Sequence, residues 1–321
     1  MPPIKGGITS SPLVREGWLR GDPMNHKTVA IIGAGRVGSS MGFLLKRAGY
    51  TVTAVAAHTA ESAQKASTFI GSGEPTTDVV HAASKAQVVF ITTPDRIIKE
   101  TCNMIANALK SGALVLHMSG AHSLDLLDAA RIAGAHRAVL HPLQSVASRE
   151  QGIATLPGSY FRIETDPEAQ VLAREIVTAL GGIELVMPKW SPDKDSAALY
   201  HAGAVAVSNY FVALVDYGLR FYQALGAERN EALKAVLPLI RGTLHNIETL
   251  GIPDALTGPI MRGDEQTVRD HLHAMQKRTP ELVSLYRELA RRTVFVARDQ
   301  GSLNQETAER LLRLVDNTNG K

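Results

Sequence analysis

A glycine-spaced turn near the start of the chain constrains its fold more than any other feature. Residues 28–38 read TVAIIGAGRVG, a short β-branched apolar run that ends in glycines at the G-x-G-x-x-G spacing. Gly33 permits a sharp turn out of a strand, Gly35 lets the backbone approach a pyrophosphate, and Gly38 lets the next helix pack close to the sheet. The N–H groups and positive dipole end at that helix start then hold the phosphates. The loop residues expected to bind a dinucleotide are Gly33, Ala34, Gly35, Arg36, Val37 and Gly38.

The residues around this loop indicate a β-α-β unit. Apolar side chains recur at helical spacing after the loop, and Gly49 follows them where a residue just beyond a helix end is expected. These apolar residues are Val37, Met41, Leu44, Leu45 and Ala48. A second strand is expected at residues 51–57. We therefore expect a dinucleotide site, with a mononucleotide site or a vestigial one as the alternatives.

The composition is typical of a soluble enzyme. The 321 residues suit two domains, and 45% of them are hydrophobic and 20% charged. The formal net charge of +3 comes without a basic run, which argues against a dedicated nucleic-acid binder. The single cysteine, Cys102, is expected to be an inert packed thiol in a reducing cytoplasm. His271 and His273 point to different faces of an expected helix, so no metal site is expected.

Neither a membrane segment nor a signal peptide is expected from the sequence. The longest apolar stretch, residues 202–215, contains Ser208 and Asn209 and is too short to span a bilayer. Residues 1–26 are rich in glycine and proline and have no apolar core. We interpret them as an irregular N-terminal extension.

The rest of the pattern divides the chain near residue 190. From residue 27 to 190, strands alternate with helices, which predicts a doubly wound α/β domain with apolar strands covered on both faces. Strands are expected at 28–32, 51–56, 87–92, 113–117, 137–140, 160–163 and 183–187, and helices at 62–69, 97–109 and 166–180, with Asp166 as the cap of the last. Residues 191–321 show amphipathic helices alone, which predicts an all-α domain. These helices start near Asp193, Asn230, Asp264 and Thr279, with a break or kink at Pro238.

Two segments at expected strand ends bear on the type of dinucleotide. An acid after the second strand is typical of NAD enzymes, but this chain has Ala-His-Thr-Ala at residues 57–60. A carboxylate would repel a 2′-phosphate, so its absence favours NADP over NAD. His58 and Thr59 would donate hydrogen bonds to that phosphate. After the strand at 87–92, Thr92, Thr93 and Pro94 are expected to border the nicotinamide ribose, or only to begin a helix.

Polar residues at the next strand ends and on the first long helix are candidates for substrate chemistry. Ser119, His141 and Gln144 follow two strands whose ends meet at one sheet edge, so we expect them to bind a polar substrate, with Ser119 also near the cofactor. On the helix, Lys194, His201 and Ser208 are spaced seven apart, share one face and are followed by Asn209. One interpretation is that Lys194 or His201 donates a proton while Asn209 orients the substrate. The other is a set of hydrogen-bonded polar groups buried at an interface.

Together these motifs resemble the Rossmann-like proteins that carry a DUF2520 C-terminal domain, relatives of the 6-phosphogluconate dehydrogenase-like reductases. The resemblance covers residues 27–316, and its most distinctive segments are Tyr200-His201-Ala202, Ser208-Asn209-Tyr210 and Leu256-Thr257-Gly258-Pro259. It implies a Rossmann-type NADP-binding domain, a helical domain that usually dimerises, and substrate contacts from Ser208 and Thr257. Many relatives have a lysine where this chain has Ala197, which favours His201 over Lys194 as the proton donor.

The combined expectation is an NADP(H)-dependent oxidoreductase that reduces a small 2-oxo acid, since some members of this family resemble ketopantoate reductases. Ketopantoate, reduced to pantoate, is then the preferred single substrate. The alternative is a non-catalytic NADP(H)-binding sensor or assembly protein with the same fold. A serine hydrolase is disfavoured, because His117 stands where a G-x-S-x-G motif around Ser119 would need its first glycine.

Overall fold

The computed structural model describes residues 28–316, so the extension expected at residues 1–26 lies outside the described residues. The chain divides into two compact units between Ser208 and Asn209. The sheet and the helix α8 (Lys194–Val207) belong to the first unit, and the second unit is helical. The expected change of character near residue 190 matches the end of the sheet, whereas the first compact unit continues through α8.

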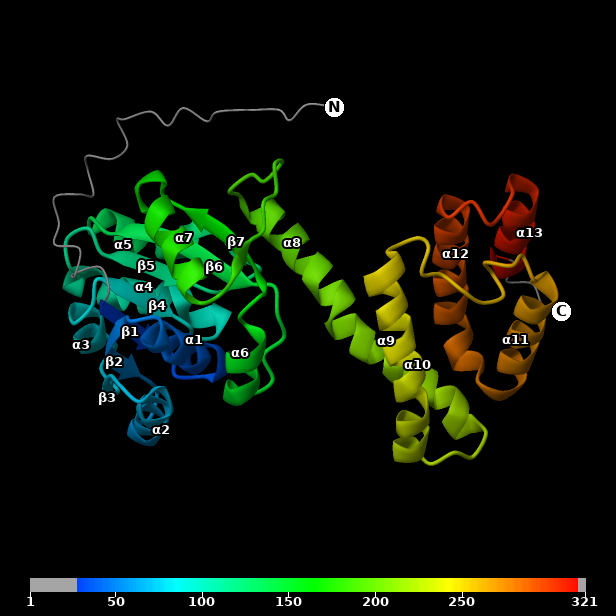
Figure 1. Ribbon diagram of the computed structural model, residues 1–321, viewed down its shortest axis with the longest axis horizontal. Helices are drawn as coiled ribbons and strands as arrows, with labels where there is room; N and C mark the ends of the chain where they lie inside the picture. Colours follow the sequence, from blue (N-terminus) through cyan, green and yellow to red (C-terminus); the bar gives the residue numbers. More distant parts are fainter. Residues whose placement is uncertain (1–27, 317–321) are drawn as a thin grey trace, which may run out of the picture. The chain divides into compact units, whose positions relative to one another are not determined.

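One eight-stranded sheet organises the first unit, in the order β3-β2-β1-β4-β5-β6-β7-β8 (Figure 1). Its strands are β1 (Thr28–Ile32), β2 (Thr51–Ala56), β3 (Glu74–Thr76), β4 (Val88–Ile91), β5 (Leu114–His117), β6 (His136–Pro142), β7 (Tyr160–Thr165) and β8 (Ile183–Glu184). The strands from β3 to β6 pair in parallel, so the carboxyl ends of β1, β4, β5 and β6 lie at one edge. That edge is where open α/β sheets bind ligands.

Helices cover both faces of the sheet, which confirms the predicted doubly wound α/β fold. One apolar core packs under α1 (Arg36–Arg47), α2 (Ala60–Ile70), α6 (Arg149–Thr155) and α7 (Gln170–Ala179), and the other under α3 (Val79–Ser84), α4 (Ile98–Ile105) and α5 (Asp128–Ile132). Cys102 on α4 is fully buried in the second core, and burial raises the pKa of its thiol. The prediction of a packed, inert thiol is confirmed.

Two features of the sheet differ from the expectation. The three-residue edge strand β3 was not expected, because Glu-Pro-Thr has no apolar pattern; it forms by pairing with β2. The strand β7 runs antiparallel to β6, with Arg162 directly opposite His141 in the ladder, and β8 runs parallel to β7. The reversal places residues from the start of β7 beside the carboxyl end of β6.

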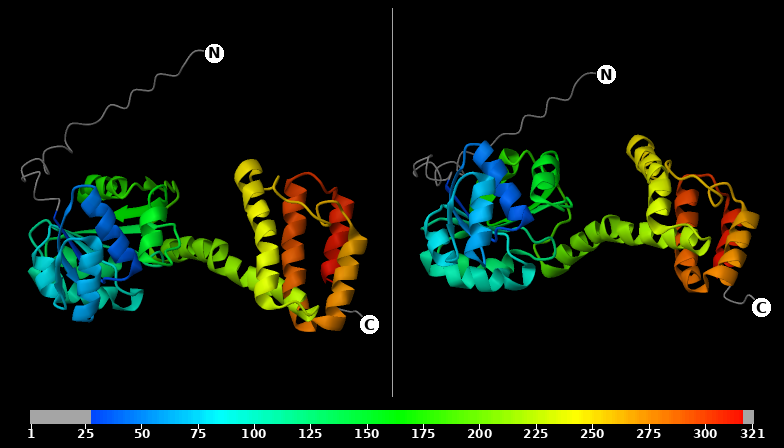
Figure 2. Two further views of the ribbon diagram at one scale, coloured as in Figure 1. Left: turned by 60° about the horizontal axis from the view of Figure 1, so that its bottom comes forward. Right: turned by 90° about the horizontal axis from the view of Figure 1, so that it is seen from below.

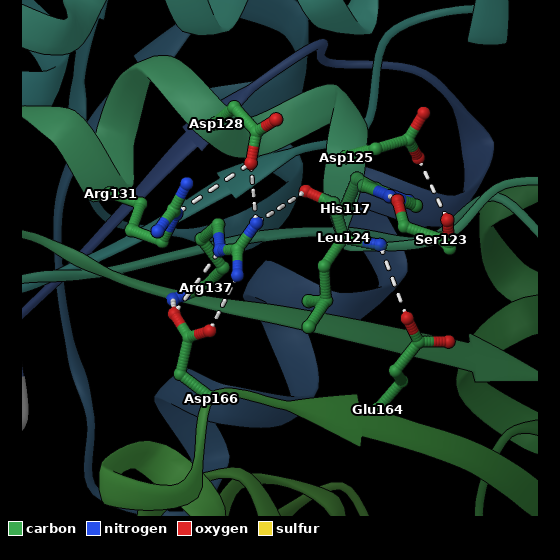
Figure 3. Close-up of polar contacts among 9 residues, drawn as sticks. All are labelled: His117, Ser123, Leu124, Asp125, Asp128, Arg131, Arg137, Glu164 and Asp166. Atoms are coloured by element: carbon green, nitrogen blue, oxygen red, sulfur yellow. Dashed lines mark hydrogen bonds and ion pairs between the residues drawn. The ribbon is translucent and has the colours of Figure 1, made fainter. Parts of the chain in front are cut away.

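Asp166 was expected to cap the helix that follows it, but its carboxylate does not do so. It accepts hydrogen bonds from the backbone N–H of Arg137 at 2.8 Å and from the guanidinium Nη2 at 2.7 Å (Figure 3). The same guanidinium also donates to Asp128 at 2.6 Å. A charge-assisted bond to a guanidinium is stronger than a bond to a neutral N–H, so Asp166 links β7 to β6 instead of capping.

All elements described from Asn209 to Asp316 are helical, which confirms the predicted all-α region. They are α9 (Asn209–Ala224), α10 (Arg229–Leu250), α11 (Glu265–Arg278), α12 (Val283–Asp299) and α13 (Gln305–Asp316). Figures 1 and 2 show α12 and α13 side by side, and their apolar faces bury Val294 and Leu311. Asp264 caps α11 as predicted by accepting from the Thr267 N–H at 3.0 Å. The helix α10 continues through Pro238.

The apolar residues 202–215 belong to a longer helical stretch than expected. Among residues 28–316, the stretch Lys194–Ala224, which comprises α8 and α9, is long and apolar enough to cross a membrane by length and composition, with a mean hydropathy of 1.4. Helices that pack against another protein surface meet the same two criteria. Length and composition therefore do not decide what covers this stretch.

His117, the last residue of β5, is buried and shapes the loop that follows it. Its Nδ1 accepts a hydrogen bond from the Ser119 N–H at 3.1 Å, and its Nε2 lies 3.0 Å from the Ser123 carbonyl oxygen. Nδ1 as acceptor leaves Nε2 as the donor, so the imidazole is neutral. Burial lowers the pKa of His117 to about 4. This histidine is part of the loop's structure.

The lowered pKa of His117 predicts a loss of stability in acid. The unfolded chain takes up a proton on this histidine below about pH 6.5, whereas the folded chain does so only below a pKa of about 4. The free energy of unfolding should therefore fall between pH 7 and pH 5, with roughly 2 kcal/mol of the fall due to His117. Urea unfolding at both pH values measures it. In His117→Gln the fall should shrink by this amount, whereas in the control His58→Gln it should not; equal falls in all three proteins would contradict the assignment.

Candidate functional site

The glycine loop after β1 has the geometry expected from its spacing. Gly33 has a φ of +103°, and a Cβ there would lie 2.6 Å from the Thr92 carbonyl carbon. A Cβ on Gly38 would collide with Thr92 Oγ1 and the Gly33 oxygen. A Cβ on Gly35, by contrast, would meet no atom within 4 Å. Gly33 and Gly38 are therefore required by packing, and Gly35 leaves open space above the helix start.

The start of α1 suits an anionic group. Gly35 occupies the N-cap position without a side-chain cap, and the first turn holds no acidic residue. Unfilled N–H groups and a helix dipole at such an end attract phosphates. Two side chains brace the loop: the Thr92 hydroxyl donates to the Gly33 oxygen at 2.6 Å, and Arg149 Nη2 donates to the Ala34 oxygen at 3.0 Å. The loop thus fits a dinucleotide pyrophosphate.

The other residues expected to contact a cofactor differ in their exposure and in their hydrogen-bond partners. His58 and Thr59 are exposed after β2, and the Thr59 hydroxyl caps α2 by accepting from the Ser62 N–H at 3.2 Å. Thr93 Oγ1 is buried without a hydrogen-bond partner among the described residues, and its backbone N–H lies against Gly33. Pro94 begins a short 3-10 turn, Asp95–Ile97. An unpartnered hydroxyl beside the glycine loop is the signature of a polar group that a ligand satisfies.

Ser119 joins the ends of β4 and β5. Its hydroxyl donates to Asp95 Oδ2 at 2.8 Å and accepts from the Ala121 N–H at 3.3 Å. His122 lies 3.9 Å from the same carboxylate oxygen. The bonds made by Ser119 connect the loop after β4 with the loop after β5, so the edge is continuous from the glycine loop to Gly120.

Two imidazole nitrogens converge above Gly120. A Cβ on this glycine would lie 2.7 Å from His141 Nε2, on β6, and 2.7 Å from His201 Nδ1, on α8. The two rings are nearly perpendicular, with centroids 6.2 Å apart. His201 Nδ1 is buried and has no hydrogen-bond partner among the described residues. Gly120 has no side chain, and this lets both ring nitrogens pack closely against its backbone.

Tyr200, next to His201 on α8, contacts the other side of His141. Its hydroxyl lies 2.9 Å from His141 Nδ1. Burial lowers the pKa of His141 to about 3, with smaller effects of the same sign from Arg162, His201 and His117. Burial also raises the pKa of Tyr200 to about 12. At neutral pH both groups are therefore uncharged.

Arg162 on β7 is fully buried and was not expected at the site. Its Nη2 donates to the carbonyl oxygens of Ser119 at 3.2 Å and His122 at 2.7 Å, and its Nη1 lies 3.3 Å from Glu164. Its guanidinium lies 4.8 Å from the Trp190 ring centroid and 5.3 Å from that of Tyr200. Burial lowers the pKa of Arg162 and raises that of Glu164. Arg162 thus holds the Gly120 loop and the Tyr200 ring together.

Glu164 extends this clamp to the end of the loop. Its Oε1 accepts from the Leu124 N–H at 3.2 Å, as Figure 3 shows beside the Arg137 network. No sequence signal indicated Arg162 or Glu164, because an alternating Tyr-Phe-Arg-Ile-Glu-Thr strand predicts an exposed face for its charged residues. The loop after β5, Trp190 and α8 cover these two side chains, and all of them come from distant parts of the sequence.

Other predicted residues of the first unit do not join this cluster. Gln144 donates to the Thr155 oxygen and Ser159 Oγ, each at 3.2 Å, so its amide holds the loop after β6. Lys194 and Ser208 are exposed at the two ends of α8. Asn209 and Thr257 belong to the second unit, where Asn209 begins α9 and Thr257 lies exposed after α10. Across residues 28–316, no three His, Cys, Asp or Glu side chains group closely enough to hold a metal ion.

Comparisons with solved structures show that the fold is shared with other proteins. A protein from Thermotoga maritima is 26% identical, with a TM-score of 0.68 and 84% of this chain and 99% of that chain covered. A protein from Bacteroides fragilis described as a candidate NADP oxidoreductase is 22% identical, with a TM-score of 0.66 and coverages of 84% and 98%. A reductive aminase from Aspergillus terreus, in complex with NADPH and ethyl-5-oxohexanoate, is 16% identical, with a TM-score of 0.55 and coverages of 90% and 91%.

Family comparisons identify both parts of the chain. Residues 21–142 match the Rossmann-like domain, and residues 159–293 match DUF2520, a domain of unknown function. None of the curated proteins matches the chain. The two matches agree with the resemblance inferred from the motifs. The chain is therefore a member of the proteins that join a Rossmann-like domain to a DUF2520 domain.

Proposed function

We propose that this protein is an NADP(H)-dependent oxidoreductase that reduces the keto group of a small 2-oxo acid, with ketopantoate as the preferred substrate. The observation that carries the proposal is the pair of imidazole nitrogens above Gly120, at the sheet edge that also bears the glycine loop. A carbonyl oxygen placed beside Gly120, between the two imidazole rings, could accept hydrogen bonds from both histidines. When bound, NADPH supplies the hydride for the carbonyl carbon.

The chain's own residues have separate roles in this proposal. His201 donates the proton to the substrate oxygen, because its Nδ1 is buried, has no partner among the described residues and lies against the same glycine as His141 Nε2. His141 orients that oxygen as a neutral donor, since a pKa of about 3 keeps it uncharged. Ser119 and Asp95 fix the loop that faces the substrate. Lys194 is exposed at the first turn of α8, which favours His201 over it as the donor.

The cofactor preference rests on the ends of β1 and β2. The loop Gly33 to Gly38 would hold the pyrophosphate, and Thr93 would contact the nicotinamide ribose with its unpartnered hydroxyl. His58 and Thr59 are exposed where a 2′-phosphate would lie, with no carboxylate to repel it at residues 57–60. The neighbours described with NADP or NADPH support this preference.

Turnover tests the proposed reaction. We expect the protein to oxidise NADPH, measured by its absorbance, when ketopantoate is added to it, and to use it better than other short 2-oxo and 3-oxo acids. His201→Ala should lower kcat by about 100-fold or more, as loss of a general acid does, while the NADPH dissociation constant stays within twofold. Undiminished turnover in His201→Ala would refute the role of His201. NADPH binding without turnover of any of these acids would favour the sensor or assembly protein instead.

A matched pair of glycine substitutions tests the cofactor loop. Gly35→Ala adds a methyl group in open space, so the free energy of unfolding should change by less than about 0.5 kcal/mol while NADPH binding weakens at least tenfold. Gly38→Ala forces a collision with Gly33 and Thr92, and it should cost roughly 1–3 kcal/mol of stability. Thermal unfolding and fluorescence titration with NADPH measure both. Unchanged NADPH affinity in Gly35→Ala would argue against a pyrophosphate at this loop.

We further propose that the protein is a cytoplasmic homodimer, formed through the second unit. Large apolar side chains are exposed on its first two helices, including Val212 at 70% and Leu239 at 68%. Many large apolar side chains exposed on two packed helices are typical of a protein interface in a soluble protein. The resemblance to the family also implies that the helical domain dimerises.

Leu239→Glu should therefore shift the protein from dimer to monomer. Burying an unpaired carboxylate at an interface costs several kcal/mol, enough to raise the dimer dissociation constant by 100-fold or more. Light scattering coupled to size-exclusion chromatography measures the mass against the 34.5 kDa of one chain. The control Ile132→Glu, at a side chain that is 82% exposed on α5 of the first unit, should leave the mass unchanged. A monomeric wild-type protein would contradict the proposal.

A further inference from the structure

The hydrogen bond between Tyr200 and His141 supports an inference about the chemistry of His141. The inference rests on the proposed reduction, in which His141 orients the substrate oxygen. We propose that Tyr200 is a positioning residue for this reaction: its hydroxyl donates to His141 Nδ1 and thereby holds His141 as the Nε2–H tautomer, with the proton on the nitrogen that lies against Gly120.

The direction of the hydrogen bond follows from the protons available. A phenol has one proton to donate, and a neutral imidazole has one N–H and one acceptor nitrogen. If His141 Nδ1 were the donor, the Tyr200 proton would find no acceptor among the described residues and would have to be given to solvent. If Tyr200 is the donor, one hydrogen bond of 2.9 Å uses both the hydroxyl proton of Tyr200 and the lone pair of His141 Nδ1. Both groups are uncharged at neutral pH, so their contact is a hydrogen bond between neutral groups.

The Tyr200 ring is held in place on three sides. The Arg162 guanidinium lies 5.3 Å from its centroid, and the Trp190 ring meets it edge-on with centroids 6.2 Å apart. The His141 ring also meets it edge-on, with centroids 5.4 Å apart. Because Arg162 is itself fixed by the carbonyl oxygens of the Gly120 loop, the hydroxyl has little freedom to turn away from His141.

The charged and titratable groups around His141 disfavour its protonation, which would place a proton on both ring nitrogens. Arg162 faces it from β7, His201 and Tyr200 from α8, and His117 from β5. The three that can carry a positive charge all disfavour a proton on His141. His141 therefore stays a neutral donor, and the acid role falls to His201. Without the Tyr200 hydroxyl, Nδ1 and Nε2 would compete for one proton, and part of the population would present a bare Nε2 to the substrate.

The tautomer is measured directly by long-range ¹H–¹⁵N correlation spectra at about pH 7, with the His141 signals identified by their loss in His141→Gln. We expect wild type and the control Tyr160→Phe, which removes a half-exposed hydroxyl from β7, to show His141 as Nε2–H. Tyr200→Phe should show a mixture with a clear Nδ1–H fraction. An Nδ1–H tautomer in the wild type, or an unchanged tautomer in Tyr200→Phe, would overturn the proposal. This readout needs no substrate, so it stands or falls separately from the proposed function.

Kinetics with the 2-oxo acid then separate positioning from a merely structural role. Tyr200→Phe should lower kcat/KM about three- to tenfold, as loss of one hydrogen bond between neutral groups does, with NADPH affinity unchanged. In His141→Gln the side-chain amide offers an N–H near the former Nε2 without help from Tyr200. Adding Tyr200→Phe to that variant should therefore change kcat/KM by less than about twofold. Equal losses in both backgrounds would show that Tyr200 acts through the fold and not through the His141 tautomer.

Discussion

The buried guanidinium of Arg162 is the interaction on which the rest of the site depends. A charge removed from water costs several kcal/mol, and it is tolerated only when hydrogen bonds and an opposite charge replace the solvent. Here two backbone carbonyl oxygens, one carboxylate and two aromatic rings replace it. These five partners come from four parts of the first unit. The cost of burying the charge is therefore offset only when the Gly120 loop, β7, Trp190 and α8 are all in place together.

Three histidines at the same sheet edge show how environment separates their roles. His117 uses both of its nitrogens within the loop and has none left for a ligand. His141 uses one nitrogen with Tyr200, and His201 Nδ1 has no partner. Fewer ring nitrogens thus have hydrogen-bond partners among the described residues as one goes from His117 on β5 to His141 on β6 and to His201 on α8. Residue type alone does not distinguish the three, whereas hydrogen-bond partners do.

Local patterns predicted the parts of the molecule that depend on local physics. The glycine spacing predicted the loop after β1, because a positive φ and a close helix approach exclude every residue but glycine at Gly33 and Gly38. The strand ends at His117 and His141 followed from apolar runs that stop at polar residues. Arg162 escaped prediction because its burial depends on contacts with the Gly120 loop, Trp190 and Tyr200, which no local pattern encodes. Asp166 and Gln144 stand at positions typical of a cap and a ligand, yet tertiary partners engage their side chains.

The reversed strand β7 also bears on how this protein is divided into modules. The Rossmann-like match ends at residue 142, just after His141, and the DUF2520 match begins at residue 159, just before Arg162. These two residues are nonetheless cross-strand partners in one sheet. The boundary between the two matched sequence segments therefore lies inside one sheet and does not coincide with the boundary between the two compact units. Recombination that exchanged one segment between distant relatives would split a strand pair and leave its buried cation without the loop it holds, so the two segments are constrained to evolve as one inheritance unit.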